Sequence, residues 1–164
     1  MWRIGSKRGF TLVELVFVAV VIGVLMASAV PQFHRQWSRL QAEQAAFHLA
    51  QTLRVARSLA VAQGRTVEWT WDAPAHRARL NIEADAGRIE PVTGRFGQGR
   101  TMADSIRVSM KRDQDDADKV RFFPDGTSEP VMMLVGEAVA PRYRIAINDT
   151  TGQVVLGRAG VSAD

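Results

Sequence analysis

The fold of this chain is decided by Gly9-Phe10-Thr11-Leu12-Val13-Glu14 and by the uncharged run that follows, from Leu15 to Gln32. The 21 positions from Phe10 to Val30 carry a single charge, that of Glu14. At about 1.5 Å rise per residue, a helix of this length spans roughly 31 Å, close to the thickness of the hydrocarbon core of a bilayer. The stretch therefore predicts a membrane helix with one acid near its start.

Arg3, Lys7 and Arg8 precede this stretch without any acid among them. Because short basic flanks remain in the cytoplasm, the C-terminal body is expected on the far side of the membrane. Three interpretations are open: a plain signal anchor, a secretory signal peptide cleaved after Ala27-Ser28-Ala29, and a leader cleaved after Gly9.

The hexapeptide from Gly9 to Glu14 resembles the G-F-T-L-x-E box of type IV pilins and type II secretion pseudopilins. The resemblance implies that a prepilin peptidase on the cytoplasmic face cleaves after Gly9 and methylates the new N-terminal Phe10. Glycine has no Cβ, so its backbone can lie close to a peptidase.

Glu14 is costly in an apolar helix, because a carboxylate at the centre of a membrane helix costs about 2.5–3.5 kcal/mol and less near the end. Cleavage after Gly9 would create a cationic α-amino group on Phe10. The pilin resemblance implies that Glu14 meets this group on a neighbouring subunit, which gives it a role in assembly. Pro31 and Gly23 fall where pilin stems commonly have helix-loosening residues, and Pro31 removes one helical hydrogen bond.

The composition limits the remaining possibilities. With no cysteine, disulfides, thiolate metal sites and cysteine nucleophiles are excluded. The formal charge is +4, but three of the 21 basic residues lie before Phe10, which leaves 18 against 17 acidic residues. The high overall pI is therefore weak support for a nucleic-acid partner.

Residues 32–64 continue the helix with apolar residues on one face, spaced alternately by 4 and 3. These residues are Ala42, Ala46, Leu49, Leu53, Ala56 and Ala60. Gly64 is placed to end the helix. Phe33, Trp37, Leu40 and Phe47 lie on a second arc, which is expected either to meet neighbouring subunits or to join the intramolecular core.

From Thr66 the apolar period changes to two, which predicts short strands. Alternating segments lie around Val67–Trp71, Ala78–Ile82, Ile106–Met110, Val120–Phe122 and Tyr143–Ile147, and Gln153–Leu156 follows a turn. Residues 83–100 are expected to form a long loop with a short strand around Ile89. Lys111–Lys119 is expected to be a charged connection, and the unbroken apolar run Val131–Val135 predicts a strand covered on both faces. Turn signals between these segments favour an antiparallel two-sheet arrangement.

A second resemblance rests on three segments of the body: the stem Leu53–Ala60, the F-x-P-D-G turn at Phe122–Gly126 and the T-G-x-V hairpin at Thr151–Val154. In this order they are similar to the corresponding segments of the GspH/FimT group of minor pseudopilins. The resemblance implies an α+β fold in which a long N-terminal helix, half transmembrane and half amphipathic, packs on a small antiparallel β-sandwich. The expected parts are a leader (1–9), a transmembrane and filament-core helix (10–31), an amphipathic stem helix (32–64) and a β-rich periplasmic domain (65–164).

The sequence gives little support for a metal site or for catalysis. His34, His48 and His76 have no zinc-ligand spacing. The acids of Asp113–Asp118 resemble the start of a calcium loop, but Asp118 and Pro124 stand where glycine and glutamate are needed. We therefore expect no catalytic residue, metal, cofactor or small-molecule substrate, and a chain that is not an enzyme.

Two functions remain. The first is a minor pseudopilin near the tip of the periplasmic pseudopilus, needed for protein export by a type II secretion system. It implies an inner-membrane protein with a single span, a cytoplasmic N-terminus and other pseudopilins as partners. The alternative is a FimT-like minor pilin that binds DNA through Arg142, Arg144 and Arg158. The G-R-x-R motif of that group is only half matched, because Gly160 follows Gly157-Arg158-Ala159 where the second arginine belongs. Nucleic acid is therefore the less expected partner.

Overall fold

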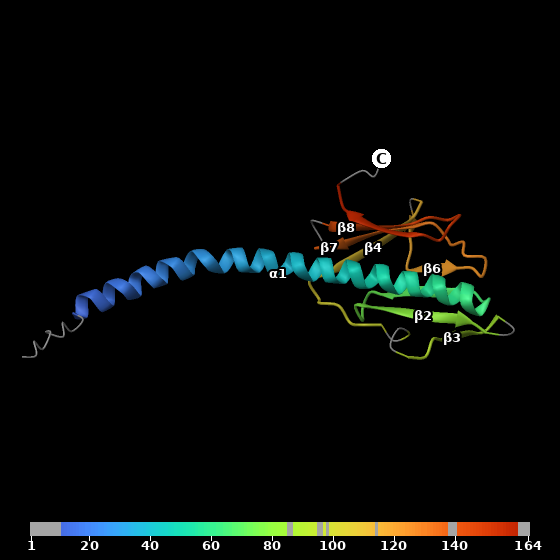
Figure 1. Cartoon of the computed structure of the whole chain (residues 1–164), viewed down its shortest axis with the longest axis horizontal. Helices are drawn as coiled ribbons and strands as arrows, with labels where there is room; N and C mark the ends of the chain where they lie inside the picture. Colours follow the sequence, from blue (N-terminus) through green and yellow to red (C-terminus); the bar gives the residue numbers. More distant parts are fainter. Residues whose placement is uncertain are drawn as a thin grey trace, which may run out of the picture. The chain divides into compact units, whose positions relative to one another are not determined.

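The computed structural model describes residues 11–84, 87–94, 97, 99–113, 115–137 and 141–160, except for the side chains of residues 27–35. One long helix is followed by short strands (Figure 1). They are α1 (Leu12–Gln63), β1 (Val67–Asp72), β2 (Arg77–Glu83), β3 (Ile89–Pro91), β4 (Arg107–Arg112), β5 (Asp115–Asp116), β6 (Lys119–Phe122), β7 (Val131–Gly136), β8 (Pro141–Ile147) and β9 (Val154–Arg158). Residues up to Trp37 and residues from Ser38 onward form two compact units.

Both ends of α1 are capped. At its start, the hydroxyl oxygen of Thr11 accepts a hydrogen bond from the backbone N–H of Glu14 (3.3 Å). At its end, Gly64 adopts a positive φ of 64°, and the N–H of Arg65 donates to the carbonyl of Ala60 (3.2 Å). This is the Schellman arrangement, which favours glycine after the last helical residue. The predicted helix end at Gly64 is confirmed.

The first unit contains the apolar beginning of α1. The helical backbone of α1 continues through Pro31. Every large apolar side chain from Leu12 to Met26 is exposed. Among the described residues, no helix combines the length and the apolarity needed to cross a membrane.

The second half of α1 buries one face in the core of the body. All six residues of the predicted face are fully buried: Ala42, Ala46, Leu49, Leu53, Ala56 and Ala60. Thr52 lies on the same face, where its hydroxyl accepts a hydrogen bond from the indole N–H of Trp69 (3.0 Å) and donates one to the carbonyl of Leu49 (2.9 Å). The small alanine side chains allow close approach to the strands, and the Thr52 hydroxyl satisfies the one polar group of the buried indole.

The strands form two antiparallel sheets, as predicted. One has the order β3-β2-β1-β6 and the other β5-β4-β7-β8-β9. In β1, Val67, Trp69 and Trp71 point into the core, as their alternation predicts. Figure 1 shows the second half of α1 with β4, β7 and β8 above it and β2 and β3 below. Buried residues of the helix and of both sheets belong to one hydrophobic core, which confirms the α+β fold class.

The prediction for Val131–Val135 is wrong in one respect. The segment is a strand, β7, but only alternate residues are buried, and Met132 is 48% exposed. The inner face of this sheet packs into the core, whereas Met132 lies on the outer face beside Ala146 of β8. In this protein the unbroken apolar run therefore corresponds to a strand whose outer face is partly apolar, and not to a strand buried on both faces of its sheet.

Two expected connections contain short strands. The loop from residue 83 to 100 includes β3, which pairs with β2 and confirms the strand expected around Ile89. The segment Lys111–Lys119, predicted as a charged connection, contains a short strand that was not predicted: Asp115 and Asp116 form β5 and pair with Arg112 and Lys111. Each acid of β5 lies directly opposite a basic residue of β4, and such pairs of opposite charge stabilise the ladder.

Candidate functional site

The N-terminal motif lies partly outside the described residues. Gly9 and Phe10, the predicted cleavage and methylation positions, precede the first described residue, so their prediction is not tested. Glu14 is described and exposed, in the first turn of α1. Its backbone N–H bonds to Thr11, while its carboxylate makes no ion pair within the described part of the chain. The carboxylate is therefore available to a group outside the described residues.

Thr11 caps the start of α1, a structural role that the sequence analysis did not predict. The spacing Thr11-Leu12-Val13-Glu14 matches the T-x-x-E pattern of a helix capping box, and Thr11 takes the capping role. Thr11 therefore fixes where the helix starts, and so also the direction in which the side chain of Glu14 projects from its first turn.

The second arc of α1 is exposed, not part of the core. Trp37, Leu40 and Phe47 are 65%, 51% and 57% exposed, whereas Phe33 lies among the side chains that are not described. Of the two alternatives for this arc, the structure therefore favours the surface for its three described residues. Large exposed apolar side chains grouped on one helix face are typical of protein–protein contacts.

The three GspH/FimT-like segments meet in space. Arg57 of α1 donates a hydrogen bond from Nε to the carbonyl of Gly126 (3.3 Å), 69 residues away in the chain. A Cβ added to Gly152 would lie 2.4 Å from this same carbonyl and 2.9 Å from Nε of Arg57. Gly126 and Gly152 both have positive φ angles, 87° and 60°. The two turns therefore pack backbone to backbone under the helix, and Arg57 ties them to it.

Further hydrogen bonds hold this junction. The N–H of Gly152 donates to the carbonyl of Asn148 (2.8 Å), and the N–H of Ser128 donates to that of Asp149 (2.9 Å). One helical turn before Arg57, Arg54 donates to the carbonyl of Val154 (3.2 Å). These contacts fix the last turns of the helix against the edge of the second sheet. The three motif segments therefore have a structural role, because their contacts hold the helix on the body.

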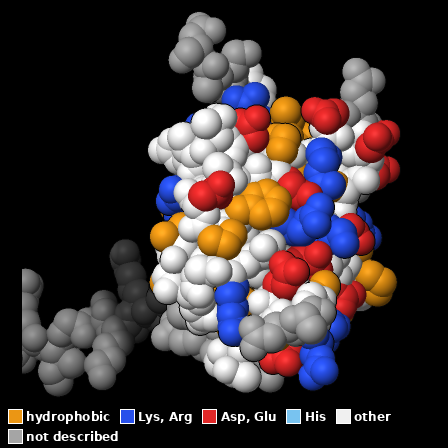
Figure 2. All heavy atoms as spheres, turned by 90° about the vertical axis from the view of Figure 1, so that its right-hand side faces the viewer, with side chains coloured by type: hydrophobic (Ala, Val, Ile, Leu, Met, Phe, Trp, Pro, Cys, Tyr) orange, Lys and Arg blue, Asp and Glu red, His pale blue; other side chains and the backbone are white. Residues whose placement is uncertain are grey.

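Glu129 carries the densest group of ion pairs in the described residues. Its carboxylate accepts hydrogen bonds from Arg121 (2.6 and 2.9 Å), from Arg112 (2.7 Å) and from the backbone N–H of Arg121 (3.2 Å). Burial raises the pKa of Glu129, but the hydrogen bond from Arg121 and the charges of both arginines outweigh it, so the pKa is lowered. Figure 2 shows basic and acidic side chains interspersed on the face that includes the end of α1.

Glu129→Gln is expected to destabilise the body by about 1–2 kcal/mol at pH 7, because two arginines lose a charged acceptor. A lowered folded-state pKa contributes stability above the unfolded pKa, about 4.3, and that stability is lost as the pH falls through the folded-state value. The difference in the free energy of unfolding between wild type and Glu129→Gln should therefore become smaller below about pH 4.3. Urea unfolding between pH 7 and pH 3 measures it. Glu90→Gln, at an exposed position of β3, is the control, and a constant difference across this range would contradict the expectation.

The three basic residues of the DNA-binding alternative are only partly brought together. Arg142 and Arg158 line a surface hollow with Arg39 of α1. Arg142 also pairs with Glu137 (3.3 Å), which reduces its positive field. Arg144 follows Arg142 by two residues in β8 and is paired in register with Gly157, while Arg158 is paired with Tyr143. The alternation of side chains along β8 therefore puts Arg144 and Arg158 on opposite faces of the sheet.

The histidines and acids do not form a metal site within the described residues. No group of three or more described His, Asp or Glu residues is arranged to hold an ion. His48 is half-buried on α1, His76 lies in the β1–β2 turn, and the side chain of His34 is not described. Asp115 and Asp116 belong to β5.

Family comparisons match the chain in two segments. The family described as type II transport protein GspH matches residues 45–160. The prokaryotic N-terminal methylation motif matches residues 4–30. Two curated fimbrial proteins of Pseudomonas aeruginosa are each 34% identical over 62 residues, which is 38% of this chain. The chain spans about 40% of the length of these relatives.

Solved structures share the fold. The minor pseudopilin EpsH from the type 2 secretion system of Vibrio cholerae is 14% identical, with a TM-score of 0.64 over 75% of this chain and 99% of that one. The type IV minor pilin FimU of Pseudomonas aeruginosa is 21% identical, with a TM-score of 0.55 over 73% of this chain and 90% of that one. At these identities the similarity establishes the pilin-like fold alone.

Proposed function

This chain belongs to the GspH family of type II transport proteins, and on that basis we propose that it is a minor pseudopilin of a type II secretion system. It acts as a structural subunit near the tip of the periplasmic pseudopilus and is needed for protein export across the outer membrane. The observation that carries the proposal is the order of the two matches, a methylation motif at residues 4–30 directly before a GspH body at residues 45–160.

The membrane role rests on the first unit. Before assembly, residues 10–31 cross the inner membrane with the basic leader in the cytoplasm and the body in the periplasm; Phe10 and the side chains of residues 27–31, which complete this segment, lie outside the described part of the chain. The basic flank of Arg3, Lys7 and Arg8 supports this orientation. The exposed apolar side chains from Leu12 to Met26 support burial of this helix in lipid and then in a filament.

The partners follow from the same proposal. A prepilin peptidase cleaves between Gly9 and Phe10 and methylates Phe10, and other pseudopilins, major and minor, then pack against the helix. The carboxylate of Glu14 meets the α-amino group of a neighbouring subunit. The chain is thus a substrate of the peptidase and works through subunit contacts, not through catalysis.

The N-terminus of the mature protein tests this function. Mass spectrometry of the protein from intact cells is expected to find methylated Phe10 as the first residue. A chain that begins at Val30 would indicate a secretory signal peptide, and an intact Met1 would indicate a plain anchor. A strain without the prepilin peptidase is the control, because there the leader should remain attached.

DNA uptake is not favoured as the function. The second arginine of the G-R-x-R motif is replaced by Gly160, Arg142 is paired with Glu137, and Arg144 and Arg158 lie on opposite faces of the sheet. Each lost phosphate contact weakens binding and lowers its salt dependence.

A further inference from the structure

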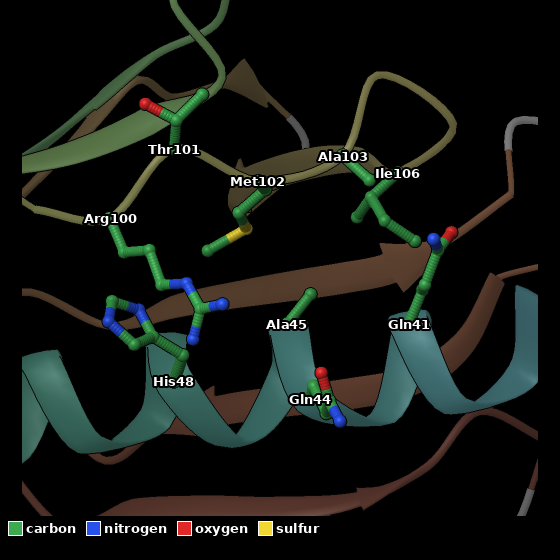
Figure 3. A pocket seen from close by; sticks show the side chains of 9 residues that line it. All are labelled: Gln41, Gln44, Ala45, His48, Arg100, Thr101, Met102, Ala103 and Ile106. Atoms are coloured by element: carbon green, nitrogen blue, oxygen red, sulfur yellow. The ribbon is translucent and has the colours of Figure 1, made fainter.

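A cavity of about 180 Å³ lies between α1 and the loop before β4 (Figure 3). The helix contributes Gln41, Gln44 and His48, and the loop contributes Arg100 and Met102. Pockets for drug-sized ligands start at about 300 Å³. This cavity therefore suits one inserted side chain better than a cofactor.

One wall of the cavity is basic and lacks an acid. Figure 3 shows the guanidinium of Arg100 extending from the loop to the imidazole of His48. Burial and then the charge of Arg100 lower the pKa of His48, and among the described residues Arg100 is the one charged group acting on it. The Nδ1 atom of His48 is buried without a hydrogen-bond partner, and Arg100 makes no ion pair in the described part of the chain. An entering carboxylate would be attracted by the guanidinium of Arg100 and would favour the protonated form of His48.

The rest of the lining is apolar. Ala45, Met102 and Ile106 are buried and close the inner side of the cavity. Gln41 is engaged, because its Oε1 accepts a hydrogen bond from the hydroxyl of Ser105 (3.1 Å). The cavity therefore combines a basic wall with an apolar floor that matches the methylene groups of a glutamate-like side chain.

The mouth of the cavity borders the exposed apolar arc of α1. Successive residues of a helix are rotated by about 100° around its axis. Gln44 therefore projects between His48 on one side and Leu40 and Phe47 on the other. Leu40 and Phe47 are exposed, and Gln44 is exposed with them. A protein that covers this arc would bring its own side chains to the mouth of the cavity.

Building on the proposed filament function, we propose that this cavity receives an acidic side chain from a neighbouring subunit. The carboxylate accepts hydrogen bonds from Arg100 and from protonated His48, and its methylene groups lie against Met102 and Ala45. The contact gives the exposed helix face a specific register, because a charge pair at the edge of an apolar contact fixes orientation more than affinity.

The first experiment uses full-length protein in detergent micelles and follows the ring signals of His48 by NMR. Propionate serves as the probe, and propionamide as its neutral counterpart. Propionate is expected to shift the signals saturably and to raise the pKa of His48. Because Arg100 is exposed, Arg100→Gln should weaken propionate binding by about threefold to fivefold. Arg88→Gln, an exposed arginine before β3, is the matched control. No response, an equal response to propionamide, or an unchanged response in Arg100→Gln would overturn the site.

The second experiment identifies the source of the carboxylate. Arg100→Glu is expected to be processed at Phe10 but to lose most of its incorporation into pseudopili, while Arg88→Glu is incorporated normally. Normal incorporation of Arg100→Glu would assign the cavity to a free carboxylate and overturn the subunit contact. If wild type itself is not incorporated, the filament function fails, and the propionate titration still decides whether the cavity binds an anion.

Discussion

Glu14→Gln is expected to insert into the membrane and to be cleaved after Gly9, yet to be nearly absent from assembled pseudopili. The substitution keeps the size of the side chain and removes only its charge. In the proposed filament, the α-amino group of the neighbouring Phe10 would then be buried without a partner. Leaving one charge of such a pair unpaired costs about 2–5 kcal/mol, which reduces subunit affinity by more than tenfold.

Membrane fractionation, N-terminal mass spectrometry and quantification of sheared filaments separate the three steps. Glu14→Leu is expected to behave as Glu14→Gln does, because it too lacks the charge. Thr11→Ala is the matched control for the helix cap, since it removes the hydroxyl that accepts the N–H of Glu14. It should weaken the start of the helix by about 1 kcal/mol without abolishing assembly. Wild-type export by Glu14→Gln would show that the carboxylate has no role in assembly.

Periodicity predicted the buried face of α1 and most strands of this fold, although it missed β5. Val67, Trp69 and Trp71 alternate with polar residues, and the apolar face of the stem repeats every three or four residues, so burial follows directly from local geometry. The run Val131–Val135 could not be interpreted in the same way. An apolar residue on an outer face, such as Met132, has no local signal that separates it from a core residue.

The contacts that join the elements were not predictable from local pattern. Arg57 lies beside the buried face of α1, and its partner Gly126 is 69 residues away. Only the fold brings the two together. The cavity beside His48 was missed for the same reason, since Arg100 belongs to a loop that sequence describes only as glycine-rich and charged. By contrast, the capping role of Thr11 was readable from the T-x-x-E spacing.

Gly152→Ala is expected to destabilise the body by about 2–4 kcal/mol. Two causes add. A φ of 60° is unfavourable for any residue with a Cβ. The new methyl group would also lie 2.4 Å from the carbonyl oxygen of Gly126, a backbone atom held by its own turn. Thermal unfolding should show a midpoint lower by roughly 10 °C.

Gly157→Ala is the matched control for this prediction. Gly157 lies in β9, its φ is not in the left-handed region, and no described atom lies within 4 Å of an added Cβ. The change should alter stability by less than about 0.5 kcal/mol. Arg57→Ala combined with Gly152→Ala separates the two contacts at the junction, because it removes the Nε atom 2.9 Å from the new methyl group but leaves the Gly126 carbonyl in place. Most of the destabilisation should therefore persist in the double variant. Full recovery there would assign the strain to the arginine side chain and contradict the backbone packing of the two turns.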